Sequence, residues 1–134
     1  MKKLFCYFIF LGMTISTQSF AGKDEYICTI LLIQALNSSG KFNELDSYLL
    51  GKSFSINRDT GDIDGKPFSN KNYKEVQILD YGSEKNGYKH IAISPPPNIL
   101  FQYIYVREYV NGSRKPFWGT DEGDKVFSGT CKSN

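Results

Sequence analysis

The sequence predicts an all-β protein, folded as a small antiparallel β-barrel, with a β-sandwich as the alternative. Three observations predict this class: short runs rich in β-branched and aromatic residues, turn-forming clusters between them, and two cysteines, Cys28 and Cys131, that lie far apart. Short strands separated by Gly, Pro, Asn and Asp are typical of barrels and sandwiches. The strand candidates are residues 25–36, 52–57, 74–80, 87–94, 99–110 and 125–131.

The apolar residues of three candidate strands alternate, and this alternation predicts the face that each strand turns toward the core. We expect the following pairs to point inward: Phe54 with Ile56, Val76 with Ile78, and Ile91 with Ile93. The fold contains at most one short helix. The candidate is residues 43–51, with Asn43 as its cap and Gly51 as its stop.

The first 21 residues predict a secretory signal peptide. Lys2 and Lys3 form a charged start, an apolar run follows, and small residues flank Phe20 before the expected cleavage after Ala21. We therefore expect residues 22–134 to be a single exported domain, periplasmic or secreted. No membrane span is expected in this mature chain.

The charge of the mature chain is balanced. Losing Lys2 and Lys3 with the signal peptide leaves 14 basic residues beside 14 acidic ones, and no Lys/Arg cluster remains. Nucleic acids and anionic membrane surfaces attract proteins through such clusters. We therefore expect neither of them as a partner.

The cysteines predict one disulfide. Cys6 leaves with the signal peptide, so Cys28 and Cys131 remain, one near each end of the mature chain. In an oxidising compartment such a pair forms a bridge. A reactive thiol pair would lie closer in sequence, and neither cysteine has a neighbouring second metal ligand. We expect the bridge to join the first and last strands.

The stretch FSINRDTGDIDG, residues 54–65, is interpreted as a β-hairpin. Its three aspartates suggest a calcium loop, but in the register that uses Gly65 the twelfth position is Lys71, where a carboxylate is needed. Arg58 to Gly61 instead form a turn, with Asp59 capping the turn amides and Gly61 supplying a positive φ. Asp62 and Asp64 then point to solvent.

The sequence offers little catalytic chemistry. His90 is the only histidine, and alternation places it on the face opposite Ile91 and Ile93, where we expect a surface residue. No nucleophile motif, phosphate loop or metal-spaced cluster is present. We therefore predict that the protein is not an enzyme and uses no cofactor and no metal.

The strongest candidate for a binding site is a row of aromatic residues. Within residues 99–110 a set of alternating positions is predicted to share one strand face, opposite the aliphatic residues. Tyrosine and arginine are enriched in binding hot spots. A rigid proline segment around Pro96 precedes the strand. Phe117 and Trp118 are interpreted as core or rim packing. The candidate binding residues are Tyr103, Tyr105, Arg107, Tyr109 and Pro96.

The order of these motifs resembles small exported bacterial β proteins that have no assigned activity, so this resemblance implies no function. The motifs are Tyr26-x-Cys28, FSINRDTGDIDG, YGSEKNGYKH, the aromatic strand, KPFWG and Gly129-Thr130-Cys131. Fragments of the chain also resemble periplasmic inhibitors of c-type lysozyme, which are small disulfide-closed barrels. The inhibitory Ser-Gly-x-x-Tyr loop of that family is absent here, and no inhibitory residue is carried over.

The sequence therefore favours a non-enzymatic exported binding module, of inhibitor or immunity type, that acts on a partner protein. The alternative is a small-ligand carrier that binds its ligand inside the barrel. A carrier would need an apolar internal cavity of roughly 300 Å3 or more. A binding module needs an exposed recognition surface instead.

Overall fold

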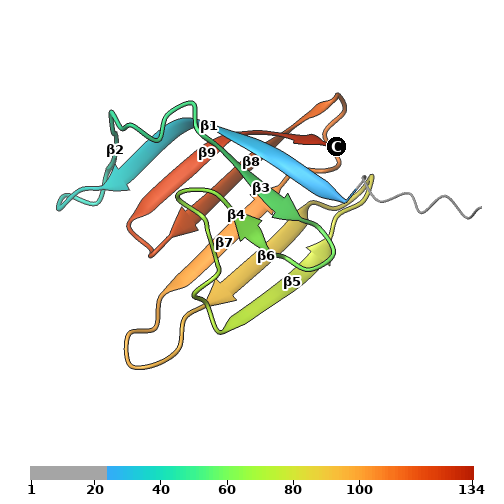
Figure 1. Cartoon of the computed structure of the whole chain (residues 1–134). Helices are drawn as coiled ribbons and strands as arrows, with labels where there is room; N and C mark the ends of the chain where they lie inside the picture. Colours follow the sequence, from blue (N-terminus) through green and yellow to red (C-terminus); the bar gives the residue numbers. More distant parts are fainter. Residues whose placement is uncertain (1–23) are drawn as a thin grey trace, which may run out of the picture.

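The computed structural model describes residues 24–134, so the predicted signal peptide lies outside the described residues. The chain forms nine strands, shown in order in Figure 1. Residues 24–134 contain no helix, and hence none able to cross a membrane. The strands are β1 (Glu25–Leu36), β2 (Phe42–Glu44), β3 (Ser53–Asn57), β4 (Ile63–Asp64), β5 (Glu75–Tyr81), β6 (Tyr88–Ile93), β7 (Phe101–Val106), β8 (Arg114–Asp121) and β9 (Lys125–Ser133).

All strands belong to one antiparallel sheet with the order β4-β3-β1-β9-β8-β7-β6-β5, and β2 pairs with β1. The sheet curls into a half-barrel whose two ends, β4 and β5, face each other (Figure 1). The prediction of an antiparallel barrel closed by a disulfide is confirmed in this partly open form. The strands do not form two packed sheets, so the sandwich alternative does not apply.

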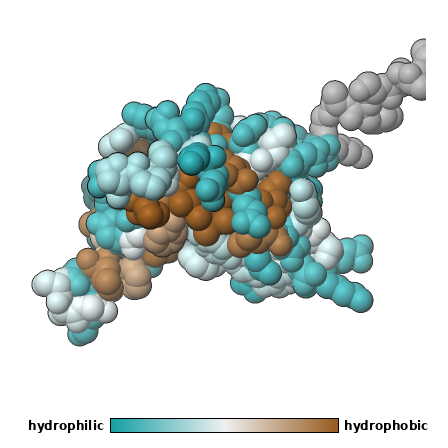
Figure 2. Space-filling view, turned by 90° about the horizontal axis from the view of Figure 1, so that it is seen from below, coloured by the Kyte–Doolittle hydropathy of each residue, from teal (hydrophilic) through white to brown (hydrophobic). Residues whose placement is uncertain are grey.

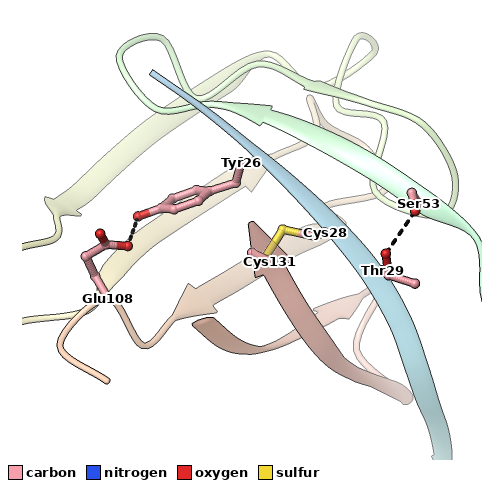
Figure 3. The surroundings of a disulfide bond; sticks show 6 residues. All are labelled: Tyr26, Cys28, Thr29, Ser53, Glu108 and Cys131. Carbon is pink, nitrogen blue, oxygen red and sulfur yellow. Dashed lines mark hydrogen bonds between the residues drawn. A yellow bond between two sulfur atoms is a disulfide. The ribbon is translucent and has the colours of Figure 1, made fainter. Parts of the chain in front are cut away.

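The pairing of β1 with β9 holds the two ends of the described chain together. It runs from Tyr26 opposite Ser133 to Ala35 opposite Lys125. Cys28 and Cys131 are direct register partners within it, and their sulfur atoms form the predicted disulfide (Figure 3). Both cysteines are fully buried. The bridge therefore crosses from the first strand to the last inside the core.

Gly129 allows β9 to approach β1 closely beside the disulfide. A β-carbon built at Gly129 would lie 1.9 Å from the carbonyl oxygen of Thr29 and 2.9 Å from the ring of Phe117. Both neighbours belong to packed strands and cannot easily move. The sequence Gly129-Thr130-Cys131 thus combines a close backbone approach with the bridge.

Aromatic rings fill the inside of the half-barrel. Phe68 lies 4.9 Å from Phe54 and 5.1 Å from Phe127 between ring centres. Phe117 contacts Phe54 edge-on at 5.4 Å. These rings are almost completely buried, and edge-on or tilted pairs of this kind are the favoured aromatic arrangement. Apolar burial of this kind is the main force that stabilises the curled sheet.

The gap between β4 and β5 is closed by side chains and a turn rather than by strand pairing. Gly61, in the turn before β4, packs so closely that a β-carbon there would lie 2.9 Å from Val76 and 3.0 Å from His90. The amide of Asn70 donates to the Gly61 carbonyl oxygen at 2.8 Å, and its oxygen accepts from the Ile63 N–H at 2.9 Å. Asn70 therefore fixes the hairpin against the far end of the sheet.

The hairpin predicted for residues 54–65 is confirmed. Phe54 and Ile56 point inward from β3, and Gly61 has the positive φ of 77° that the turn requires. One detail of the prediction is wrong, because Asn57 caps the turn in place of Asp59. The Oδ1 atom of Asn57 accepts from the N–H groups of residues 59 and 60, each at 3.0 Å.

The short helix considered for residues 43–51 does not form, which agrees with the expectation of at most one helix. Asn43 lies in β2, whose residues pair with the end of β1, and residues 48–51 form a turn. The Ser47 hydroxyl accepts from the Leu49 N–H at 3.2 Å, and Gly51 donates its N–H to the Ile30 carbonyl oxygen at 2.8 Å. The β2 pairing and the Gly51 hydrogen bond reach β1 and are available only in the tertiary structure, so they outweigh local helix propensity.

We predict that breaking the disulfide destabilises the domain strongly. The cysteines are 103 residues apart, and the chain-entropy estimate for so large a loop is about 4–5 kcal/mol. Urea unfolding of a Cys28→Ala/Cys131→Ala variant, compared with the parent protein, measures this difference. A loss below about 1 kcal/mol would show that the sheet holds its ends together without the bridge.

Candidate functional site

The candidate site is the outer side of β6, β7 and β8. Side chains of β7 alternate: Gln102, Ile104 and Val106 are buried, whereas Tyr103 and Tyr105 lie on the outside. The sequence predicted this arrangement of aliphatic and tyrosine faces, and the structure agrees with it. Both tyrosines are half-buried on this outer side.

Trp118 extends the tyrosine row onto the neighbouring strand. It is the register partner of Tyr105, and its ring centre lies 6.4 Å from Tyr105 and 5.2 Å from Tyr103. The side chain is 41% exposed. We call Tyr103, Tyr105 and Trp118 the aromatic ridge. Core or rim packing was expected for both Phe117 and Trp118, but only Phe117 is in the core.

Arg107 and Tyr109 lie beyond the end of β7, so the prediction that they continue the strand is wrong. They nevertheless contact the ridge. The Nε–H of Arg107 donates to the Tyr109 hydroxyl at 2.9 Å, and the Tyr105 hydroxyl donates to the same oxygen at 3.3 Å. The Tyr105 hydroxyl and the Arg107 guanidinium together hold the pKa of Tyr109 below its usual range. A positively charged group therefore sits at the end of the ridge.

Pro96 does not belong to this cluster. It lies in the loop before β7, at the end of the strand opposite Arg107, and its side chain is exposed. Phe101, the first residue of β7, separates this loop from the ridge and is 45% exposed. Four of the five candidate binding residues are thus brought together, and the proline is apart from them.

The orientation predicted for β6 is wrong. Tyr88, His90 and Ala92 are buried, whereas Ile91 and Ile93 are half-buried on the outside. Ile91 is the register partner of Tyr103, and Ile93 that of Phe101. The aliphatic residues therefore add to the ridge. We call the aromatic ridge together with Ile91, Ile93 and Phe101 the outer apolar face.

Figure 2 views the molecule from below relative to Figure 1, the side on which β5 and β6 lie. It shows a hydrophobic area there, crossed and bordered by hydrophilic side chains. Gln77 and Lys89 are two polar residues on this side, as register partners of Ile91 and Tyr105. An exposed apolar area with a polar border is typical of interaction sites.

His90 is buried on the inner side of β6 and is not a surface residue. Its Nε2 atom lies 3.3 Å from the amide nitrogen of Asn70, and the turn at Gly61 covers its ring. Burial lowers the pKa of His90 to about 4. The residue is therefore neutral at physiological pH and contributes to closing the half-barrel.

On the outer side of the opposite half, β3 and β4 carry polar residues, whereas β1 also exposes Leu31. A cleft of about 590 Å3 opens between this side and the start of β5, and its lining includes Asn57, Asp62 and Val76. Lys71 donates to Asp64 at 2.8 Å in the same cleft, which lowers the pKa of Asp64. Within residues 24–134, no three acidic, histidine or cysteine side chains converge as a metal site would require.

No family model, curated protein or solved structure matches this chain. The functional conclusion therefore depends on the geometry of the described residues.

We predict that His90 titrates near pH 4 in the folded protein. Because its folded pKa lies below the unfolded value of about 6.5, its contribution to stability is complete above pH 6.5 and is lost progressively toward pH 4, by about 3 kcal/mol in total. NMR titration of the imidazole gives a single signal, since the chain has one histidine. A midpoint near 6.5 would mean that the ring is solvated.

Proposed function

We propose that the protein is a non-enzymatic, exported binding module that recognises a partner protein through its outer apolar face. The observation that carries this proposal is the outward-facing aromatic ridge with Arg107 at its end. Several large aromatic residues of the described chain are exposed, but Trp118 differs from the others because it packs against two tyrosines of the neighbouring strand, and this exposed cluster requires an explanation. Binding is that explanation.

The composition of the face suits recognition of a protein. Tyrosine, tryptophan and arginine dominate binding hot spots because each combines a large apolar area with a polar group. The ridge is also preorganised. Trp118 packs against both tyrosines, and hydrogen bonds join Tyr105, Tyr109 and Arg107. Side chains that are already ordered lose little conformational entropy when a partner binds.

The interior of the domain supports surface binding rather than a carrier function. Phe54, Phe68, Phe117 and Phe127 occupy the centre of the half-barrel with their rings about 5 Å apart. A carrier would need open space at this place. The buried position of His90 likewise favours a structural role for the one imidazole over acid–base chemistry.

The disulfide is consistent with export, because structural disulfides persist in oxidising compartments. Together with the signal peptide predicted from residues 1–21, it supports a periplasmic or secreted location. The partner is then a protein of the cell envelope or the surrounding medium.

We predict that the variant Tyr103→Ala/Trp118→Ala remains folded but loses its partner. Removal of two central hot-spot residues typically costs 2 kcal/mol or more, so we expect at least roughly a tenfold loss in affinity. The measurement is capture of exported proteins on the immobilised mature protein, followed by titration of the captured partner against each variant.

Tyr48→Ala is the matched control, because Tyr48 is 75% exposed but lies in the turn after β2. Trp118→Lys serves as a second variant that keeps a long side chain and adds charge. Equal capture by the parent protein and both ridge variants would contradict the proposal. Unfolding of both variants would show that the ridge is structural.

A further inference from the structure

We propose that the partner seated on the outer apolar face is a second copy of this chain, packed face to face about a two-fold axis. This inference rests on the proposed function, since it assigns a partner to the same face. Three observations lead to it: the apolar centre of the face, the opposite charges at its two ends, and the symmetry that these charges allow.

One end of the outer apolar face is basic. Arg107 lies just beyond β7, its side chain is exposed, and it forms no ion pair within residues 24–134. Lys89 is the register partner of Tyr105 and therefore projects from the same side of the sheet. Asp80 offsets Lys89 in part, at a nitrogen-to-oxygen distance of 3.6 Å.

The other end of the face is acidic. Glu75 is the register partner of Ile93, so its exposed side chain projects from the outer side. Glu122 follows β8, and its N–H donates to the carbonyl oxygen of Phe101 at 3.2 Å, which places it beside the start of β7. Both carboxylates are exposed, and neither forms an ion pair in the described part of the chain. The cations at this end are Lys74, next to Glu75, and Lys125, the register partner of Asp121.

These charges make the face complementary to itself. A two-fold axis that lies in the interface and runs perpendicular to β7 exchanges the two ends of the face. Arg107 of one copy then lies over Glu122 of the other, and Lys89 lies over Glu75. Every pair occurs twice, because residues on the two sides of an isologous interface exchange roles.

The same axis places the aromatic ridge of one copy on the aromatic ridge of the other at the centre of the interface. Phe101 and Trp118, the most exposed large side chains of the face, become covered, and the strands of the two copies pack in the aligned manner of stacked sheets. Burial of the apolar centre provides the affinity, while the charged ends fix the orientation. An axis parallel to β7 would instead place Arg107 on Arg107, so the charges select one arrangement.

The test is sedimentation of the mature protein over concentrations of about 1 to 100 μM. We expect a dimer that weakens as salt rises. Arg107→Glu and Glu122→Arg should each weaken the dimer by roughly tenfold or more, because each reversal acts twice in a two-fold interface. The combined variant Arg107→Glu/Glu122→Arg restores the opposite charges and should recover the parent dissociation constant.

Lys41→Glu is the control, because Lys41 is an exposed cation between β1 and β2, away from the face. A parent protein that stays monomeric at the highest concentration overturns the inference, as does a dimer that both single reversals leave unchanged or that the combined variant does not rescue. A monomer that still captures an exported protein through Tyr103 and Trp118 would leave the proposed function standing. Loss of both dimer and capture would overturn the two together.

Discussion

The pairing of β1 with β9 is the constraint on which the rest of the structure depends. On one side of it lie β3 and β4, and on the other lie β8, β7, β6 and β5, so this pairing is the link that makes one sheet out of the two parts. The Cys28–Cys131 bridge lies within this pairing, and so does Gly129, where the backbones of β9 and β1 approach closely because glycine has no side chain. Backbone pairing, covalent constraint and close packing thus act at the same place.

The half-barrel that results has two different outer sides. On the side formed by β1, β3 and β4, polar residues such as Ser55, Asn57 and Asp64 surround the exposed Leu31, and this side borders an open cleft. The side formed by β6, β7 and β8 carries isoleucines and aromatic rings. Since the aromatic core already fills the interior, these outer apolar residues do not stabilise a second layer of the same domain. Their position is consistent with the proposed contact with another molecule.

The sequence was sufficient to predict features that depend on local pattern or on two residues, such as the disulfide, the hairpin at Gly61 and the split of β7 into an aliphatic and a tyrosine face. It was insufficient where residues distant in sequence determine the orientation of a strand or the secondary structure of a segment. In β6, hydrophobicity favours Ile91 inside, yet His90 is buried because Asn70 and the Gly61 turn, distant in sequence, enclose it. Residues 43–51 have helix propensity, but β1 offers them hydrogen bonds. Phe117 points inward, so the alternation of side chains along β8 could have predicted that Trp118 points outward.

The accessibility of Trp118 decides most directly whether the ridge is a surface presented to a partner. The chain contains one tryptophan, so its fluorescence reports on this position alone. With 41% of the side chain exposed, acrylamide and iodide should both quench the emission of the native protein under conditions where it is monomeric. Emission that resists both quenchers until the protein unfolds would place the indole in the core and contradict a recognition role for this face.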